Sequence, residues 1–115
     1  MAFNEDLALR IRNIVNLFPN KITSNFKEKK MFGGLAFLYK GKMTVGIVND
    51  SLMVRVIDSK MPSLLKDKNI RPMDFTKRPM KEFIYVEEAG YRTELQLQTW
   101  IELGLEHAQL KLKKI

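Results

Sequence analysis

Two Arg-Pro-Met triplets, which begin at Arg71 and Arg78, have the residue types and spacing that most suggest chemistry. Proline disfavours the helical conformation for the residue before it, so the sequence predicts both arginines in extended segments. With Lys81, their guanidinium groups could hold a carboxylate or a phosphate of a partner in a fixed geometry. The simpler alternative is that the prolines protect an edge strand and that each arginine pairs with a local acid such as Asp74 or Glu82.

A cluster of lysines between residues 21 and 42 is the second charged feature. The chain has 20 Lys and Arg against 13 Asp and Glu, a net charge of +7, and this stretch holds six lysines against one glutamate. It could bind nucleic acid, an acidic protein or an anionic membrane surface. The alternative is a solvated lysine-rich face, because the stretch lacks the interleaved arginines and aromatic residues of single-strand binders. The nucleic-acid hypothesis names as contacts Lys21, Lys27, Lys29 and Lys30.

Residues for catalysis, metal binding or a cofactor are poorly represented. The chain has no cysteine, which excludes disulfides, thiol nucleophiles and thiolate metal sites. Glu87 and Glu88 are adjacent and should point in opposite directions, which argues against a pair of carboxylates that act together as general acid and general base. The segment Phe32-Gly33-Gly34-Leu35 lacks the further glycine and the Lys-Ser/Thr of a phosphate-binding loop. We therefore predict no catalytic, cofactor or metal residues.

His107 is the single histidine, so it has no second histidine or cysteine with which to form a zinc site or a catalytic dyad. It lies near the end of the predicted last helix, beside the polar residues Glu106 and Gln109. A positive imidazole interacts favourably with a helix C-terminus. We expect an exposed side chain near that helix end.

The elements that must position these residues follow from apolar periodicity and turn signals. We expect a first helix from Asn4 to Phe18, a three-stranded antiparallel meander, a short helix over 60–67, two short strands and a last helix. The meander strands are predicted at 30–39, 42–49 and 52–57, joined at Lys40-Gly41 and at Asn49-Asp50. The later strands are predicted at 73–76 and 83–86.

The last helix has the strongest signals. Thr93 and Gln96 form a potential capping box, and apolar residues repeat on one helical face as far as about Leu110. Gly104 lies on that apolar face, where glycine costs about 1 kcal/mol relative to alanine, so we expect a close packing contact there. The element order predicts an α+β fold with a mostly antiparallel sheet covered by helices.

Length and composition predict one domain over residues 1–115. The chain has 115 residues, of which 45% are hydrophobic and 29% charged, as in compact globular domains. Its first residues carry acids where a signal peptide would be basic, and no apolar run approaches the roughly 18 residues of a membrane span. We expect a soluble cytoplasmic protein with no membrane partner.

Several of these segments together resemble the N-terminal domain of the TfoX/Sxy competence regulators. The resemblance lies in Met31-Phe32-Gly33-Gly34-Leu35-Ala36-Phe37, in Gly41-Lys42-Met43, in Leu52-Met53-Val54-Arg55-Val56 and above all in the two segments that contain Arg71-Pro72-Met73 and Arg78-Pro79-Met80. It covers nearly the whole chain, with Trp100 in the final helix. It implies a fold like that of type III secretion chaperones, helix-β3-helix-β2-helix. It supplies no catalytic residues.

The same resemblance implies a role in bacterial transcriptional regulation of DNA uptake, where such proteins act as co-activators. Full-length regulators carry a second, helical domain, and this sequence ends at Ile115 directly after the first. We therefore expect a non-enzymatic regulatory or protein-binding domain, which the chaperone-like fold suggests is a homodimer. The alternatives are a nucleic-acid-binding module and, with least support, an enzyme for a small anionic substrate held by Arg71 or Arg78.

Overall fold

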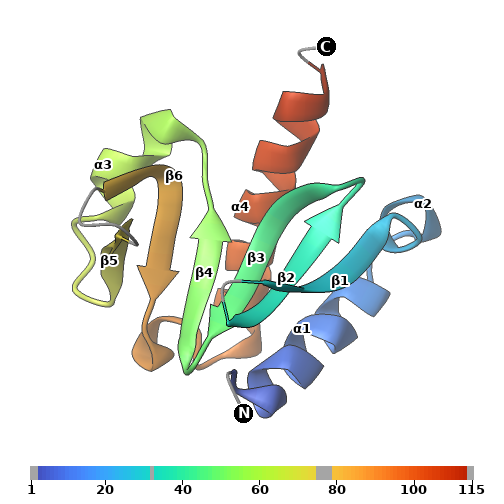
Figure 1. Cartoon of the computed structure of the whole chain (residues 1–115), viewed down its shortest axis with the longest axis horizontal. Coiled ribbons are helices and arrows are strands. Elements are labelled where there is room, and N and C mark those ends of the chain that lie inside the picture. The colour runs from blue at the N-terminus through green and yellow to red at the C-terminus, as the bar shows by residue number, and fades with distance from the viewer. Residues whose placement is uncertain (1–2, 32, 75–78, 114–115) are drawn as a thin grey trace.

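A six-stranded antiparallel sheet with helices on one side forms the protein (Figure 1). The computed structural model describes residues 3–31, 33–74 and 79–113, and within these ranges all side chains except those of 31, 73–74 and 79–81. The elements are α1 (Glu5–Asn16), α2 (Asn20–Thr23), β1 (Phe26–Met31), β2 (Gly34–Tyr39), β3 (Lys42–Val48), β4 (Ser51–Arg55), a 3-10 turn (Asp58–Lys60), α3 (Met61–Leu64), β5 (Ile70–Asp74), β6 (Pro79–Val86), a second 3-10 turn (Glu88–Gly90) and α4 (Glu94–Lys113).

The strand order in space is β1-β2-β3-β4-β6-β5, so β1 and β5 are the two edges. The predicted α+β class with an antiparallel sheet is confirmed. The sheet has one strand more than expected, because the lysine-rich segment interpreted as a connection forms β1. The two predicted hairpin joints are present, and Lys40 and Asn49 both have the positive φ that such tight turns use.

Both long helices begin with the caps expected from the sequence. The Asn4 side chain accepts a hydrogen bond from the Leu7 backbone N–H at 3.0 Å. At α4 the Thr93 hydroxyl accepts from the Gln96 N–H at 3.1 Å, and the Gln96 side chain accepts from the Thr93 N–H at 2.9 Å. These bonds satisfy backbone donors that a helix N-terminus would otherwise leave unpaired.

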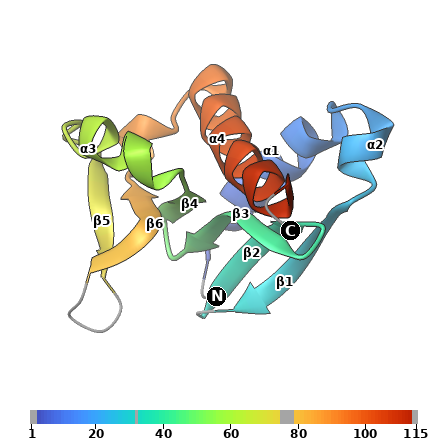
Figure 2. The same ribbon diagram turned by 90° about the horizontal axis from the view of Figure 1, so that it is seen from above.

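The main core lies between the sheet and its helices. Seen from above, α1, α2, α3 and α4 all lie on one side of the sheet, and none of the described helices lies on the opposite side (Figure 2). One face of the sheet packs apolar side chains against the helices, which contribute buried residues such as Leu7, Ile11, Leu97 and Ile101. Gly104 allows the close approach of α4 that the sequence suggested, because a Cβ there would lie 2.7 Å from the Thr44 carbonyl carbon.

Candidate binding surfaces

The helix-free face of the sheet carries one row of side chains that crosses all six strands. Strand pairing places the members of the row side by side, in the spatial order Lys29, Ala36, Gly46, Met53, Tyr85 and Arg71. The four central members are small or apolar, with a tyrosine among them, and both end members are basic. The face therefore has an apolar middle between two positive margins.

A small second core forms the middle of this face. Ala36, Met43 and Met53 are buried, and partly buried apolar side chains from neighbouring strands pack around them. Gly46 makes room for this packing, because a Cβ at that position would lie 2.7 Å from the methyl carbon of Met53. Half-buried Phe83 and Tyr85 border this core, and they leave part of an aromatic surface exposed to solvent.

Arg71 is held firmly at the β5 margin of the face. Its guanidinium lies 4.9 Å from the centre of the Tyr85 ring, and its Nε donates a hydrogen bond to Glu87 Oε1 at 2.6 Å. The acid that pairs with Arg71 is thus Glu87, whereas Glu82 lies with Arg55, His107 and Lys111, and the side chain of Asp74 is outside those described. Burial raises the pKa of the Tyr85 hydroxyl above its ordinary value, with the charge of Arg71 opposing the shift. Tyr85 therefore stays neutral and offers its ring to Arg71.

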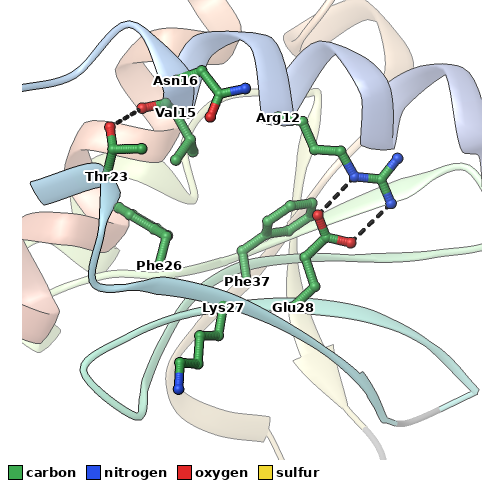
Figure 3. A pocket seen from close by; sticks show the side chains of 8 residues that line it. All are labelled: Arg12, Val15, Asn16, Thr23, Phe26, Lys27, Glu28 and Phe37. Carbon is green, nitrogen blue, oxygen red and sulfur yellow. Dashed lines mark hydrogen bonds and ion pairs between the residues drawn. The ribbon is translucent and has the colours of Figure 1, made fainter. Parts of the chain in front are cut away.

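The four lysines of the nucleic-acid hypothesis do not gather at one point. Lys21 lies on α2, and Lys27, Lys29 and Lys30 are exposed on β1. Successive side chains of a strand point to opposite faces, so Lys27 and Lys29 lie on the helix-free face and Lys30 on the other. Figure 3 shows Lys27 pointing away from α1.

The two remaining predicted contacts are only partly covered by the structure. Arg78 lies outside the described residues. The backbone of Lys81 belongs to β6, but its side chain is not among those described. Of the three predicted anion contacts, only Arg71 can therefore be assigned to a surface.

A cavity of about 360 Å³ lies between α1 and β1. Apolar side chains from three elements line it, Val15 on α1, Phe26 on β1 and Phe37 on β2. Figure 3 shows Phe26 and Glu28 pointing from β1 toward α1, with Phe37 between them. The polar lining includes the Thr23 hydroxyl, which is already engaged with the Val15 carbonyl at 2.6 Å.

A two-bond ion pair closes one side of this cavity. Arg12 donates from Nε to Glu28 Oε2 at 2.6 Å and from Nη2 to Glu28 Oε1 at 2.8 Å, which joins α1 to β1. The hydrogen bonding with Glu28 raises the pKa of the Arg12 guanidinium above its ordinary value. Both charges of the pair are engaged with each other, so neither is free to bind an ionic ligand.

His107 is buried, so the prediction of an exposed side chain near the helix end is wrong. The side chain is 2% exposed, and its Nε2 lies 3.1 Å from Glu82 Oε1. Arg55 Nη2 and Lys111 Nζ lie 3.8 and 3.6 Å from the same carboxylate. This cluster fixes α4 against β6 and the end of β4. The described parts of the chain contain no group of three or more His, Cys, Asp or Glu residues that could hold a metal ion.

Sequence reasoning missed Tyr85 and the cavity as parts of binding surfaces, and it missed the buried Met53 that supports Tyr85. Alternation along the strands could have placed Met53 and Tyr85 on one face, but only the observed pairing of β4 with β6 makes them neighbours. No local signal predicts the cavity, because α1, β1 and β2 build it together. None of the described helices is long and apolar enough to cross a membrane.

Comparison with known proteins agrees with the resemblance seen in the sequence. No curated protein matches the chain. The family model of the TfoX N-terminal domain matches residues 21–108, which run from α2 to α4 and include every strand of the sheet. The chain therefore belongs to the TfoX N-terminal domain family.

Proposed function

We propose that this chain is a non-enzymatic regulatory domain that binds another protein through the helix-free face of its sheet. Membership of a family of competence-related regulatory domains supports the regulatory part of the proposal. The surface itself supports protein binding. The partner that fits best has an apolar centre flanked by acidic residues.

The cross-strand row from Lys29 to Arg71 is the observation that carries this proposal. Protein interfaces are enriched in tyrosine, methionine and arginine, with an apolar centre and a polar rim. The row has half-buried Tyr85 toward its centre, next to buried Met53 of the small second core, and basic residues at both ends. Arg71 is ordered by the Tyr85 ring and by its ion pair with Glu87, so a partner carboxylate would have to share with Glu87 a guanidinium whose position is fixed in advance.

Nucleic acid fits this surface less well. Affinity for a phosphate backbone comes from several cations that reach it together. Lys21, Lys27, Lys29 and Lys30 are divided between α2 and the two faces of β1, and the centre of the helix-free face is apolar. A competence role through a protein partner therefore remains our proposal, and direct nucleic-acid binding is an outcome that its test must separate.

The test is site-specific photo-crosslinking in the cells that make the protein. A benzophenone amino acid placed at Tyr85 keeps an aromatic side chain on the helix-free face. The matched control places it at Lys66, an exposed residue shortly after the end of α3. Figure 2 shows α3 on the side of the sheet opposite to the helix-free face. We expect a discrete protein adduct from position 85 and none from position 66. Adding Arg71→Gln to the first variant should reduce the yield of the adduct.

The nature of the adduct decides between the alternatives. A nuclease-sensitive adduct would favour the nucleic-acid module, and an adduct at twice the chain mass of 13.4 kDa would identify a second copy. Equal protein adducts from positions 85 and 66, or no protein adduct from either, would refute binding through the helix-free face.

A further inference from the structure

The outer edge of β1 has unpaired backbone groups among the described residues. β1 is the first strand in the sheet order and pairs only with β2. The Lys40 N–H donates to the Asn25 carbonyl at 3.0 Å, so Asn25 and Lys40 are a hydrogen-bonded pair directly before β1. Along β1, residues whose backbone groups bond to β2 therefore alternate with residues whose backbone groups point away from β2. Backbone groups of Lys27 and Lys29 then point to β2, and those of Glu28 and Lys30 point outward. A further strand would find donors and acceptors there.

The cavity between α1 and β1 lies on the helix side of this strand edge. Its floor is formed by Val15, Phe26 and Phe37, and its volume of about 360 Å³ is ample for one large apolar side chain. In a strand added to β1, every second side chain would lie beside Phe26 and Glu28, which point toward the cavity (Figure 3). One strand could therefore use the edge and fill the cavity together.

The positive charge of β1 determines which kind of added strand it would bind best. Lys27, Lys29 and Lys30 are exposed, and the acid of the strand, Glu28, is engaged by Arg12. Opposite charges on paired strands stabilise a sheet, and like charges directly opposite destabilise it. Two copies of β1 that paired with each other would set lysines against lysines. An acidic strand from another protein is favoured over a second copy.

Lysines on an edge strand also discourage aggregation, and that role needs no partner. It accounts for Lys27, Lys29 and Lys30, but it does not account for an apolar cavity beside the same edge. The edge and the cavity are independent observations, and they point to the same occupant.

We propose that β1 binds an extended acidic segment of a partner protein as a seventh strand, and that this segment inserts one large apolar side chain into the cavity between α1 and β1. Main-chain hydrogen bonds would supply affinity, and the cavity would supply specificity. This site differs from the helix-free face and does not depend on Tyr85 or Arg71.

The experiment begins with selection from a displayed library of random peptides of about eight residues, long enough for one strand. The whole chain and its Lys30→Pro and Lys30→Ala variants serve as targets. Both variants remove the charge, but only proline removes the outward N–H, at an edge position that tolerates it. We expect acidic peptides with alternating apolar residues. Their consensus should bind Lys30→Pro at least about tenfold more weakly than Lys30→Ala.

Two further measurements locate the peptide. The amide protons of Glu28 and Lys30 should gain protection from hydrogen exchange when it binds. Replacing the apolar anchor of the peptide by serine should weaken binding to the natural chain. The same replacement should matter much less for Val15→Phe, whose added ring fills the cavity, so a double-mutant cycle detects the contact. The far-ultraviolet circular dichroism of each variant shows that the fold is retained.

Several results would overturn the proposal. They are the absence of any enriched peptide, equal affinity for Lys30→Pro and Lys30→Ala, and binding without protection of the two amides. Protection that appears without peptide as the protein is concentrated would identify a second copy as the occupant. Duplex DNA that binds this edge while peptides do not would assign the lysines to nucleic acid.

Discussion

His107 shows how a single residue can join three elements of this fold. It is a buried imidazole on α4, in contact with Glu82 of β6, and Arg55 of β4 and Lys111 of α4 approach the same carboxylate. Glu82 has a φ of 69°, which is uncommon for a residue with a side chain, and its backbone carbonyl accepts from the Val56 N–H at 2.9 Å. The backbone conformation at Glu82 is therefore maintained by contacts with neighbouring elements.

Both titrating members of this cluster have lowered pKa values. Burial lowers the pKa of His107 below its ordinary value of 6.5, with the contact to Glu82 opposing it. For Glu82, burial acts to raise the pKa, but His107, Lys111 and Arg55 together lower it below its ordinary value of 4.5. The unfolded chain thus binds both protons at a higher pH than the folded protein does.

Stability should therefore fall as the pH falls. The contribution of each group is present in full above its ordinary pKa and is lost progressively as the pH falls from that value through the lower pKa of the folded state, beginning near pH 7 for His107 and near pH 5 for Glu82. Urea unfolding at about pH 8 and pH 6 should show this loss in the natural chain. His107→Gln, which cannot titrate, should lose less over the same interval. An equal loss in both proteins would contradict the assignment to His107.

The burial of His107 could have been predicted from the helical period of buried residues along α4. Counting by three to four residues from Trp100 through Gly104 leads to His107 and Ala108, all of which are buried. The neighbours Glu106 and Gln109 suggested the surface instead. On a helix, sequence neighbours point in different directions, so the period is the better guide.

At the scale of elements, the position of α4 depends on Gly104. In an exposed helix, replacing glycine by alanine stabilises by about 1 kcal/mol. Here a Cβ would meet the backbone of Thr44, whose own hydroxyl donates to the Phe37 carbonyl at 2.8 Å, so β3 has little freedom to move away. Burial of α4 against the sheet therefore reverses the sign of the usual effect.

We expect Gly104→Ala to lower the free energy of unfolding by about 1–3 kcal/mol, the usual cost of overpacking. Urea denaturation followed by circular dichroism measures this difference. Glu102→Ala, at an exposed position of the same helix, should change it by no more than about 0.5 kcal/mol. Unchanged or increased stability of Gly104→Ala would show that α4 can move away from Thr44.

Most elements could be predicted from the sequence because their signals are local. The caps at Asn4 and Thr93 and the turns at Lys40 and Asn49 each depend on a few neighbouring residues. β1 was missed because an edge strand with four charged residues among six lacks apolar alternation. Its strand conformation comes from pairing with β2, which is a tertiary contact.

The candidate surfaces were less predictable for the same reason. Arg71 was singled out from its sequence context, but its partners Tyr85 and Glu87 come from the neighbouring strand. The cavity needs α1, β1 and β2 at defined positions before its lining exists. A surface assembled from several elements is set by their packing, and the sequence of any one of them does not show it.

At the scale of the whole molecule, positive charge lies at both edges of the sheet. Lys29 and Arg71 end the same cross-strand row, and the net charge of the chain is +7. Two copies that packed their helix-free faces together with these rows aligned would bring basic ends against basic ends. A homodimer of this kind would have to form against electrostatic repulsion.

Salt should separate self-association from binding of an acidic partner. Raising the NaCl concentration from about 0.05 to 0.5 M shortens the screening length to a few ångströms, which weakens repulsion and attraction alike. We expect the dimer fraction in sedimentation velocity to rise with salt and the affinity for acidic peptides to fall. A dimer that dissociates as salt is added would contradict this account and would imply ion pairs across its interface.

The hydrogen bond between Trp100 and Gly90 has a practical consequence. Trp100 is the single tryptophan of the chain, its side chain is 9% exposed, and its indole N–H donates to the Gly90 carbonyl at 2.8 Å. This bond joins the last helix to the turn that follows β6. Separation of the two would expose the indole to water and shift its fluorescence to longer wavelength. The protein thus contains its own optical reporter for the docking of α4, without any added label.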